Sequence, residues 1–180
     1  MTSTTGIFDY EVNEDTHDLF DVTLDSNQIQ TLVTHAPHLV ESWLDDIYRI
    51  HRRRLHHLIV GLDVEWRPNN RHFENPAATL QLCVGRRCLV FQLIYASYFP
   101  DSLIDFLGDE SLAVEMGNRD LRNAGLKGLA RAVLGMEIHK PRSVTLSRWD
   151  REFLTYEQVQ YACIDAFLSF EIGRCLNAAG

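Results

Sequence analysis

Two acidic residues, two positions apart, end one apolar stretch of the sequence. Asp63 and Glu65 follow the run LIVGL at positions 58–62, which is typical of a buried strand. Strand residues two apart point to the same face, so both carboxylates are expected on one side of a sheet. Carboxylate oxygens bind hard divalent cations such as Mg²⁺. Because Asp-x-Glu is a common tripeptide, a solvated strand end explains it better if it stands alone.

A second pair lies near the end of the chain. Tyr161 and Asp165 are four positions apart, so in a helix they stack on one face. A phenol beside a carboxylate can orient a metal-bound water. Taken alone, the pair fits better a tyrosine at the edge of the core whose hydroxyl bonds to the neighbouring acid.

These side chains need a sheet and helices to bring them together. Apolar runs predict strands at 58–66, 78–84 and 88–94, the last two joined by a short turn containing Gly85, and the three should form an antiparallel meander. Thr155 and Gln158 form a capping box at the start of a last helix that runs to about residue 176. Other expected elements are a hairpin within 8–34, helices at 39–53, 102–107 and 121–134, and a strand at 111–116.

The composition indicates one globular α/β domain. Of the 180 residues, 46% are hydrophobic and 23% charged, and we expect a single domain over 1–180, with an N-terminal hairpin and helix in 1–57 and the core in 58–180. The net charge of −8 does not suit a protein that grips phosphates over its whole surface, so any nucleic-acid site must be local. Basic clusters at 51–54, 86–87 and 139–151 are candidates, although each also fits a solvated face.

Cysteine usage and apolar run lengths predict where the protein resides. The four cysteines form no CxxC pair and are expected to be reduced. The first residues, MTSTTGIFDYEVNED, lack the pattern of a secretory signal, and no apolar stretch approaches the roughly 20 residues of a membrane span. We therefore expect an intracellular protein, nuclear or cytoplasmic.

Together, these motifs resemble a known family over nearly the whole chain. The residues that carry the resemblance are VGLDVEWRP, NPAATLQLCVGRRCLVFQL, LRNAGLKGLARAVLG and SRWDREFLTYEQVQYACIDAF. They are similar to the Werner-syndrome type of 3'-5' exonuclease domain, especially its plant members, in the DEDDy subclass of the DnaQ/RNase H-like superfamily. The resemblance implies a mixed RNase H-like sheet flanked by helices, made of a three-strand antiparallel meander and one or two parallel strands.

The same resemblance assigns roles to the candidate residues. It implies that Asp63, Glu65 and Asp165 are metal ligands for Mg²⁺ or Mn²⁺ and that Tyr161 positions the attacking water. In such enzymes two ions about 3.5–4 Å apart clamp the scissile phosphate. Leu62 and Trp66 are expected to pack in the core, with a contact to a terminal base as the lesser alternative. The candidate nucleic-acid contacts are Trp66, Arg67, Ser147 and Trp149, and a core position for Trp149 fits equally well.

The chain departs from the family between the short helix and LRNAGLKGLA. Family members carry there a strand and helix with a further catalytic aspartate, whereas here the link is short. Asp120 is better explained as a helix N-cap than as a replacement, and Asp109 or Glu115 are the other candidates. A missing ligand predicts weak binding of one ion and strongly impaired or lost nuclease activity, a pseudoenzyme that keeps the fold to bind nucleic acid or a protein partner. The alternative is an active, metal-dependent 3'-5' exonuclease that uses a substitute carboxylate.

The same departure predicts self-association. The strand that carries Asp63 and Glu65 should be central in the family's sheet, and a lost strand and helix would expose a sheet edge and apolar surface beside it. A homodimer that joins these truncated edges would cover that surface. The competing expectation is a monomer in which the LRNAGLKGLA helix fills the space.

Overall fold

A mixed six-stranded sheet is the framework of the described molecule. The computed structural model describes residues 3–69, 73–109 and 125–178. Within these ranges the strand order is β1-β2-β3-β6-β5-β4. The strands are β1 (Thr5–Asp9), β2 (His17–Leu24), β3 (Asn27–Thr34), β4 (Gly61–Trp66), β5 (Ala77–Val84) and β6 (Arg87–Gln92). The predicted mixed α/β fold is therefore confirmed.

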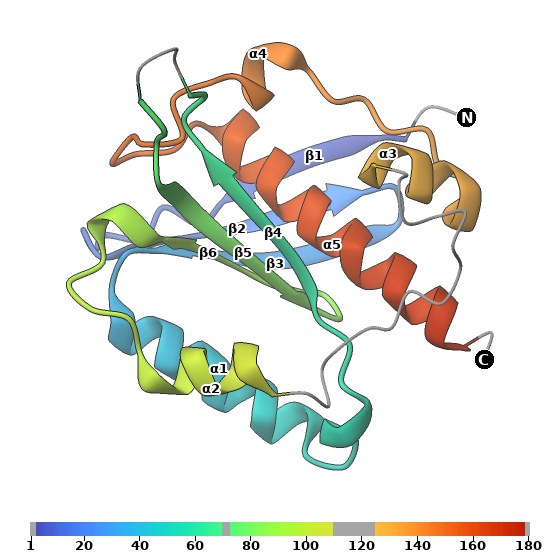
Figure 1. The fold of residues 1–180 in the computed structure, drawn as a ribbon, viewed down its shortest axis with the longest axis horizontal. Coiled ribbons are helices and arrows are strands. Elements are labelled where there is room, and N and C mark those ends of the chain that lie inside the picture. Colours follow the sequence, from blue (N-terminus) through green and yellow to red (C-terminus); the bar gives the residue numbers. More distant parts are fainter. Residues whose placement is uncertain (1–2, 70–72, 110–124, 179–180) are drawn as a thin grey trace.

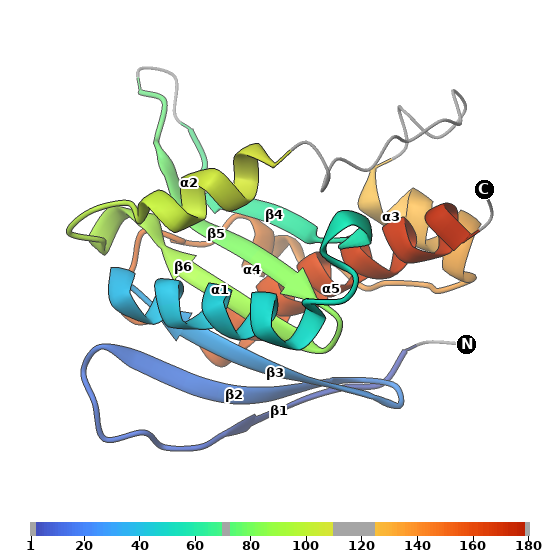
Figure 2. The same cartoon turned by 90° about the horizontal axis from the view of Figure 1, so that it is seen from below.

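Helices lie on both faces of this sheet. The α-helices are α1 (Pro37–His51), α2 (Asp101–Gly108), α3 (Leu126–Leu129), α4 (Arg142–Thr145) and α5 (Tyr156–Ala178). Three short helices, η1 (Leu55–His57), η2 (Leu93–Tyr95) and the π-helical η5 (Ala130–Leu134), complete the described set. Helix α5 crosses one face of the sheet, and α1 and α2 cover the other (Figure 1). The sheet edge at β1 and β2 extends beyond α1, as the turned view shows (Figure 2).

Two antiparallel hairpin units build the sheet, and one parallel pair joins them. The N-terminal hairpin predicted within 8–34 is present as β2 and β3, while β1 begins earlier than the sequence indicated, at Thr5. The predicted meander is present as β4, β5 and β6, with Gly85 at a φ of 62° in the β5–β6 turn. The parallel pairing of β3 with β6, in which Thr31 faces Cys88, was not predicted. Apolar periodicity shows which residues are buried but not which strand lies next to which.

Each face of the sheet packs its own hydrophobic cluster. On the α1 and α2 side, α1 buries Trp43, Leu44 and Ile47 against alternate residues of β5 and β6. On the α5 side, the cluster includes Trp149, Phe167 and Leu168. Burying alternate strand residues on opposite faces follows from the two-residue period of a strand. The predicted amphipathic helix at 39–53 and the predicted last helix are both confirmed.

The segment between α2 and α3 is described only at its ends. The predicted strand at 111–116 and the first residues of the predicted helix at 121–134 lie outside the described residues. The rest of that helix is α3 followed by η5, and it ends at Gly135, whose φ of 68° fits the predicted C-cap. Strand β4 was expected to be central, and it stands last in the described strand order. No described helix is both long enough and apolar enough to span a bilayer.

Candidate metal centre

Strand β4 and helix α5 approach each other closely at Gly61. A Cβ atom built on Gly61 would lie 2.0 Å from the carbonyl oxygen of Ala166 and 2.5 Å from the amide nitrogen of Phe170. Both neighbours are backbone atoms of α5, so no side-chain rotation could make room. Only glycine permits this approach. The contact fixes the distance between the strand and the helix that carry the candidate ligands.

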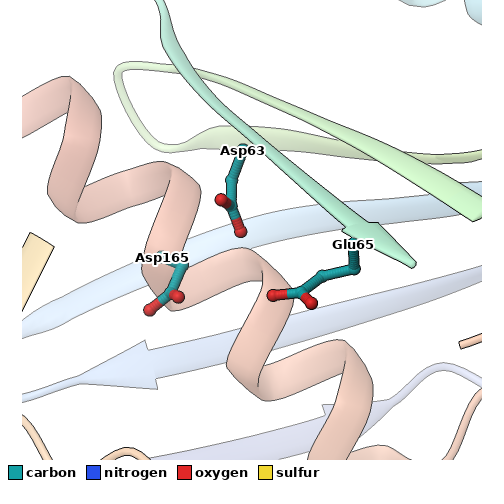
Figure 3. A group of neighbouring side chains, drawn as sticks. All are labelled: Asp63, Glu65 and Asp165. Atoms are coloured by element: carbon teal, nitrogen blue, oxygen red, sulfur yellow. The ribbon is translucent and has the colours of Figure 1, made fainter. Parts of the chain in front are cut away.

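Three carboxylates converge where these two elements meet. Asp63 and Glu65 project from β4 on the same side of the sheet, toward Asp165 on α5 (Figure 3). One carboxylate oxygen from each residue lies within 4.8 Å of the others. The structure thus brings together the three residues that the sequence singled out as metal ligands.

The buried position of these acids disfavours their charged forms. Burial, reinforced by the neighbouring Asp165, raises the pKa of Asp63 to about 6. Burial, with the charges of Asp63 and Asp165, raises the pKa of Glu65 to about 8. Burial also raises the pKa of Asp165. A cluster of this kind is costly unless a cation neutralises it.

The group fits a divalent cation by the chemistry of its donors. Its ligand atoms are all carboxylate oxygens, which Mg²⁺ and Mn²⁺ prefer. The Oδ2 atom of Asp63 is buried and forms no hydrogen bond within the described structure, so it is an unsatisfied hydrogen-bond acceptor. Behind it, Gln81 and Thr79 of β5 are fully buried opposite Asp63 and Glu65 and bond to each other, Nε2 donating to Oγ1 at 2.6 Å.

Tyr161 lies beside Asp165, as the helical spacing predicted. Its hydroxyl accepts a hydrogen bond from Thr145 Oγ1 at 3.5 Å, and its ring packs 5.9 Å from that of Trp149. Burial is the main cause that raises the pKa of this phenol. A cavity of about 200 Å³, lined mainly by apolar atoms, opens next to Tyr161 and Asp165 between α5 and the N-terminal residues Ser3 and Thr5.

A lysine lies within the acidic group. Lys140 Nζ is 2.5 Å from Asp165 Oδ2, and it stands 5.3 Å from the centre of the Tyr161 ring. Burial is the largest single influence on Lys140 and acts to lower its pKa, but the charge and hydrogen bond of Asp165 together with those of Tyr161 outweigh it, and the pKa is raised. In turn, the ammonium group opposes the effect of burial on Asp165. The sequence placed Lys140 only within a basic run, 139–151.

The predicted nucleic-acid contacts fall into two groups. Trp66 and Arg67 are exposed at the end of β4, and Arg67 pairs with Asp150 at 3.4 Å. Ser147 is half-buried, and its hydroxyl accepts a hydrogen bond from Gln158 Nε2 at 2.9 Å. Trp149 is fully buried and donates from Nε1 to the carbonyl of Thr145. This position supports the alternative that Trp149 is a core anchor.

One expectation about β4 is wrong. Leu62 and Trp66 were expected to pack in the core, yet 48% of Leu62 and 49% of Trp66 is exposed. Both point away from the sheet face that α5 covers, because they alternate with Asp63 and Glu65 along the strand.

Two residues that shape this site were not singled out by the sequence analysis. Gly61 could have been noticed as a glycine inside a strand pattern, which often marks a close backbone approach. Lys140 is one of two lysines in the chain, but nothing in its local sequence links it to Asp165, 25 positions away.

Comparison with known proteins finds relatives that are named 3'-5' exonucleases. No protein-family model matches the chain. A 3'-5' exonuclease of Arabidopsis thaliana is 29% identical over 151 residues, which cover 66% of this chain and 52% of that protein. The bifunctional 3'-5' exonuclease/ATP-dependent helicase WRN of Mus musculus is 27% identical over 154 residues, covering 68% of this chain and 11% of that protein. The chain is therefore similar in sequence to proteins named 3'-5' exonucleases.

The fold of the chain agrees with that similarity. RNase D of Escherichia coli, an exoribonuclease, superposes with a TM-score of 0.62 at 15% sequence identity, over 81% of this chain and 44% of that one. At an identity this low the similarity concerns the fold alone. The superposition confirms the predicted RNase H-like fold. The chain spans about half the length of its Arabidopsis relative and a smaller part of the mouse protein.

Proposed function

We propose that this chain is a DEDDy-type domain that binds the 3' end of a nucleic-acid strand through a divalent cation, and that its hydrolytic activity is strongly impaired or lost. The observation that carries the proposal is the convergence of Asp63, Glu65 and Asp165 within 4.8 Å, from two different elements. Tyr161 stands beside Asp165, where a phenol can orient a water molecule. The chain's relatedness to 3'-5' exonucleases supports this assignment.

The three carboxylates would hold Mg²⁺ or Mn²⁺ weakly and as a single ion. A bound cation polarises phosphate oxygens and neutralises part of their charge. The chain itself would supply the geometry, because the Gly61 contact fixes β4 against α5. Close placement matters, since a shift of about 1 Å can cost on the order of 100-fold in rate.

The reason to expect impaired hydrolysis is the short segment between α2 and α3. Helix α2 ends at Gly108 and α3 begins at Leu126, and the family resemblance implies a strand, a helix and a fourth carboxylate in this interval. The alignment with the Arabidopsis protein runs over 151 positions but takes up 66% of this 180-residue chain, so it contains gaps in this chain. Gaps of this kind agree with a shortened segment.

Nucleic-acid binding would be confined to the surroundings of this site. With a net charge of −8, the chain offers no general attraction to phosphates. Arg67, which directly follows β4 and is exposed, would provide a guanidinium for a phosphate. The exposed indole of Trp66 points to the opposite side of β4 from the three carboxylates, so a base could stack on it only beyond the end of the strand. An unpaired 3' end is the part of a strand that can reach such a small site.

The test is a binding and degradation assay on one set of strands. Fluorescein-labelled single strands of DNA and RNA, and a recessed duplex, are incubated with the protein and Mn²⁺ or Mg²⁺, with Asp63→Ala as the control. We expect metal-dependent binding that prefers a free 3' hydroxyl over a 3' phosphate and that Asp63→Ala weakens, with degradation near background. Equal binding with and without metal would contradict the proposal.

An active 3'-5' exonuclease is the second candidate. A substitute carboxylate from Asp109, Glu115 or Asp120 could complete the site, and the last two lie outside the described residues. The observation that favours this candidate is that Asp63, Glu65, Tyr161 and Asp165 are all present and close together. Robust, metal-dependent laddering that Asp63→Ala and Asp165→Ala both abolish would establish it.

Homodimerisation stays a prediction. In the described order β4 pairs with β5 on one side. Light scattering after size exclusion at low micromolar concentration tests for a dimer, and a concentration-independent mass near the monomer value of 20.7 kDa would refute it.

A further inference from the structure

Lys140 is the positively charged side chain closest to the acidic group among the described residues. Its Nζ atom contacts Asp165 Oδ2 at 2.5 Å, and Asp165 is almost fully buried. The lysine side chain itself is 25% exposed, so it reaches inward from the surface. Lys140 directly precedes Pro141 and helix α4 in the sequence, and its ammonium group lies over the ring of Tyr161.

The charges of this group balance only in certain combinations. Three ionised carboxylates carry three negative charges, Lys140 supplies one positive charge, and a divalent cation supplies two. The described group is therefore neutral with Lys140 and one divalent ion together. Without an ion, Lys140 compensates only one of the three carboxylates, the one on Asp165.

Lys140 and a divalent ion also act on the same ligand. Both are attracted to the Asp165 carboxylate, and two cations bound to one carboxylate repel each other strongly where water is largely excluded. An ammonium group hydrogen-bonded to Asp165 thus weakens the pull of that carboxylate on a metal. This cost is distinct from any gain that Lys140 makes by orienting the carboxylate.

We propose that Lys140 is a built-in cation of the acidic site: it neutralises Asp165 in the metal-free protein and competes with the divalent ion for that carboxylate. The inference rests on the metal site of the proposed function, and it explains why that site would bind metal weakly. It makes Lys140 a regulator of metal affinity and assigns it no part in contacting substrate.

The test compares charge-removing and charge-retaining variants. Mn²⁺ binding is measured by titration calorimetry for the wild type, Lys140→Gln and Lys140→Arg, with Lys127→Gln as the matched control. Lys127 is the other lysine of the chain and is exposed on α3. We expect Lys140→Gln to bind Mn²⁺ roughly tenfold more tightly, the size of effect that one charge-assisted hydrogen bond can cause. Lys140→Arg and Lys127→Gln should stay within about twofold of the wild type.

Thermal unfolding provides a second readout that does not depend on activity. Metal-free Lys140→Gln should melt below the wild type, because Asp165 loses its partner in a buried place. Saturating Mn²⁺ should raise the melting temperature of Lys140→Gln more than that of the wild type, since tighter binding to the folded state adds more stability. The same curves show whether each variant folds.

The outcomes separate this inference from the proposed function. Unchanged Mn²⁺ affinity in Lys140→Gln would overturn the inference, and weaker affinity would also overturn it by showing that Lys140 orients Asp165 for the metal. If Lys140→Gln does not fold, an affinity of Lys140→Arg several-fold tighter than the wild type would count against competition by charge. A wild type that binds no Mn²⁺ while Lys140→Gln binds it would support competition. Absence of Mn²⁺ binding in every variant would instead defeat the proposed metal site.

Discussion

Strands β4 and β6 flank β5 in the same sheet, yet they differ in what their side chains do. In β6 the residues from Cys88 to Phe91 are all buried without measurable exposure, and they alternate between the two hydrophobic clusters. In β4 the residues after Gly61 are half-buried or exposed, and two of them are carboxylates with raised pKa values. One strand contributes to stability by apolar burial, and the other carries two partly buried acids whose charged forms reduce stability.

This difference indicates where residues can be substituted without unfolding the molecule. Apolar burial contributes about 25 cal/mol for each Å² removed from water, so a fully buried strand supplies much of the stability of the sheet. A cluster of buried acids works against folding unless a cation neutralises it. The site is therefore placed on a framework whose stability comes from β5, β6 and the helices packed on them.

The largest contrast is expected from truncating one apolar side chain in each strand. Phe91→Ala in β6 should lower the free energy of unfolding by about 3–5 kcal/mol, because it removes a fully buried ring and leaves a cavity. Leu62→Ala in β4 should cost less than about 1 kcal/mol, since 48% of Leu62 is exposed. Urea denaturation measures both. Equal losses would show that β4 is packed more tightly than described.

Gly61→Ala should give the next largest effect and should act on both stability and metal binding. The added Cβ would meet the backbone of α5 at Ala166, so the strand and helix must move apart, at a cost of about 1–3 kcal/mol or more. Asp63 and Asp165 would separate with them, and Mn²⁺ affinity should fall at least tenfold by calorimetry. Gly108→Ala, where the new Cβ meets no atom within 4 Å, is the matched control and should change neither.

Unlike most substitutions, Glu65→Gln should stabilise the metal-free protein, because it removes a charge that burial disfavours. The gain should be roughly 1 kcal/mol, since partial exposure of Glu65 to water limits the penalty of its charge. The pKa of Glu65 rises from 4.5 to about 8 on folding, so the folded state holds a proton that the unfolded state releases. Wild-type stability should then decline as pH rises between those values.

Melting curves across this pH range provide the check. The decline should be shallower in Glu65→Gln, and Mn²⁺ should stabilise this variant less than the wild type. A variant that is less stable than the wild type at pH 8 without metal would contradict the view that β4 carries a destabilising charge cluster.

Thr155→Ala should have the smallest effect, and it should leave the site untouched. Gln158 N donates to Thr155 Oγ1 at 3.3 Å, and Gln158 Oε1 accepts from Thr155 N at 3.0 Å, so both halves of the predicted capping box are present. Losing the threonine oxygen should cost about 1 kcal/mol. Mn²⁺ affinity should stay within about twofold of the wild type, because Asp165 lies almost three turns further along α5. A large loss of affinity would show that the cap controls the position of Asp165.

Local patterns predicted the parts of this molecule that depend on local physics. A two-residue period placed Asp63 and Glu65 on one side of β4, a four-residue spacing stacked Tyr161 and Asp165, and the Thr155–Gln158 spacing predicted the start of α5. Each needs only the geometry of one element. The hairpin units followed from apolar runs separated by turn residues.

The features that the sequence did not predict depend on distant partners. The parallel pairing of β3 with β6 joins Thr31 to Cys88, and the ion pair joins Lys140 to Asp165. The exposure of Leu62 and Trp66 depends on what covers one face of β4, which its own residues do not specify. The apolar periodicity of one segment does not indicate which distant segment packs against it.

The division of the carboxylates between β4 and α5 also has a consequence for biosynthesis. The ribosome adds Asp165 roughly 100 residues after Asp63, which takes some 5–20 s at typical rates of 5–20 residues per second. Until α5 emerges and docks at Gly61, the nascent chain carries two of the three carboxylates and lacks the helix that completes the cluster. The complete three-carboxylate group therefore exists only after α5 has docked against β4.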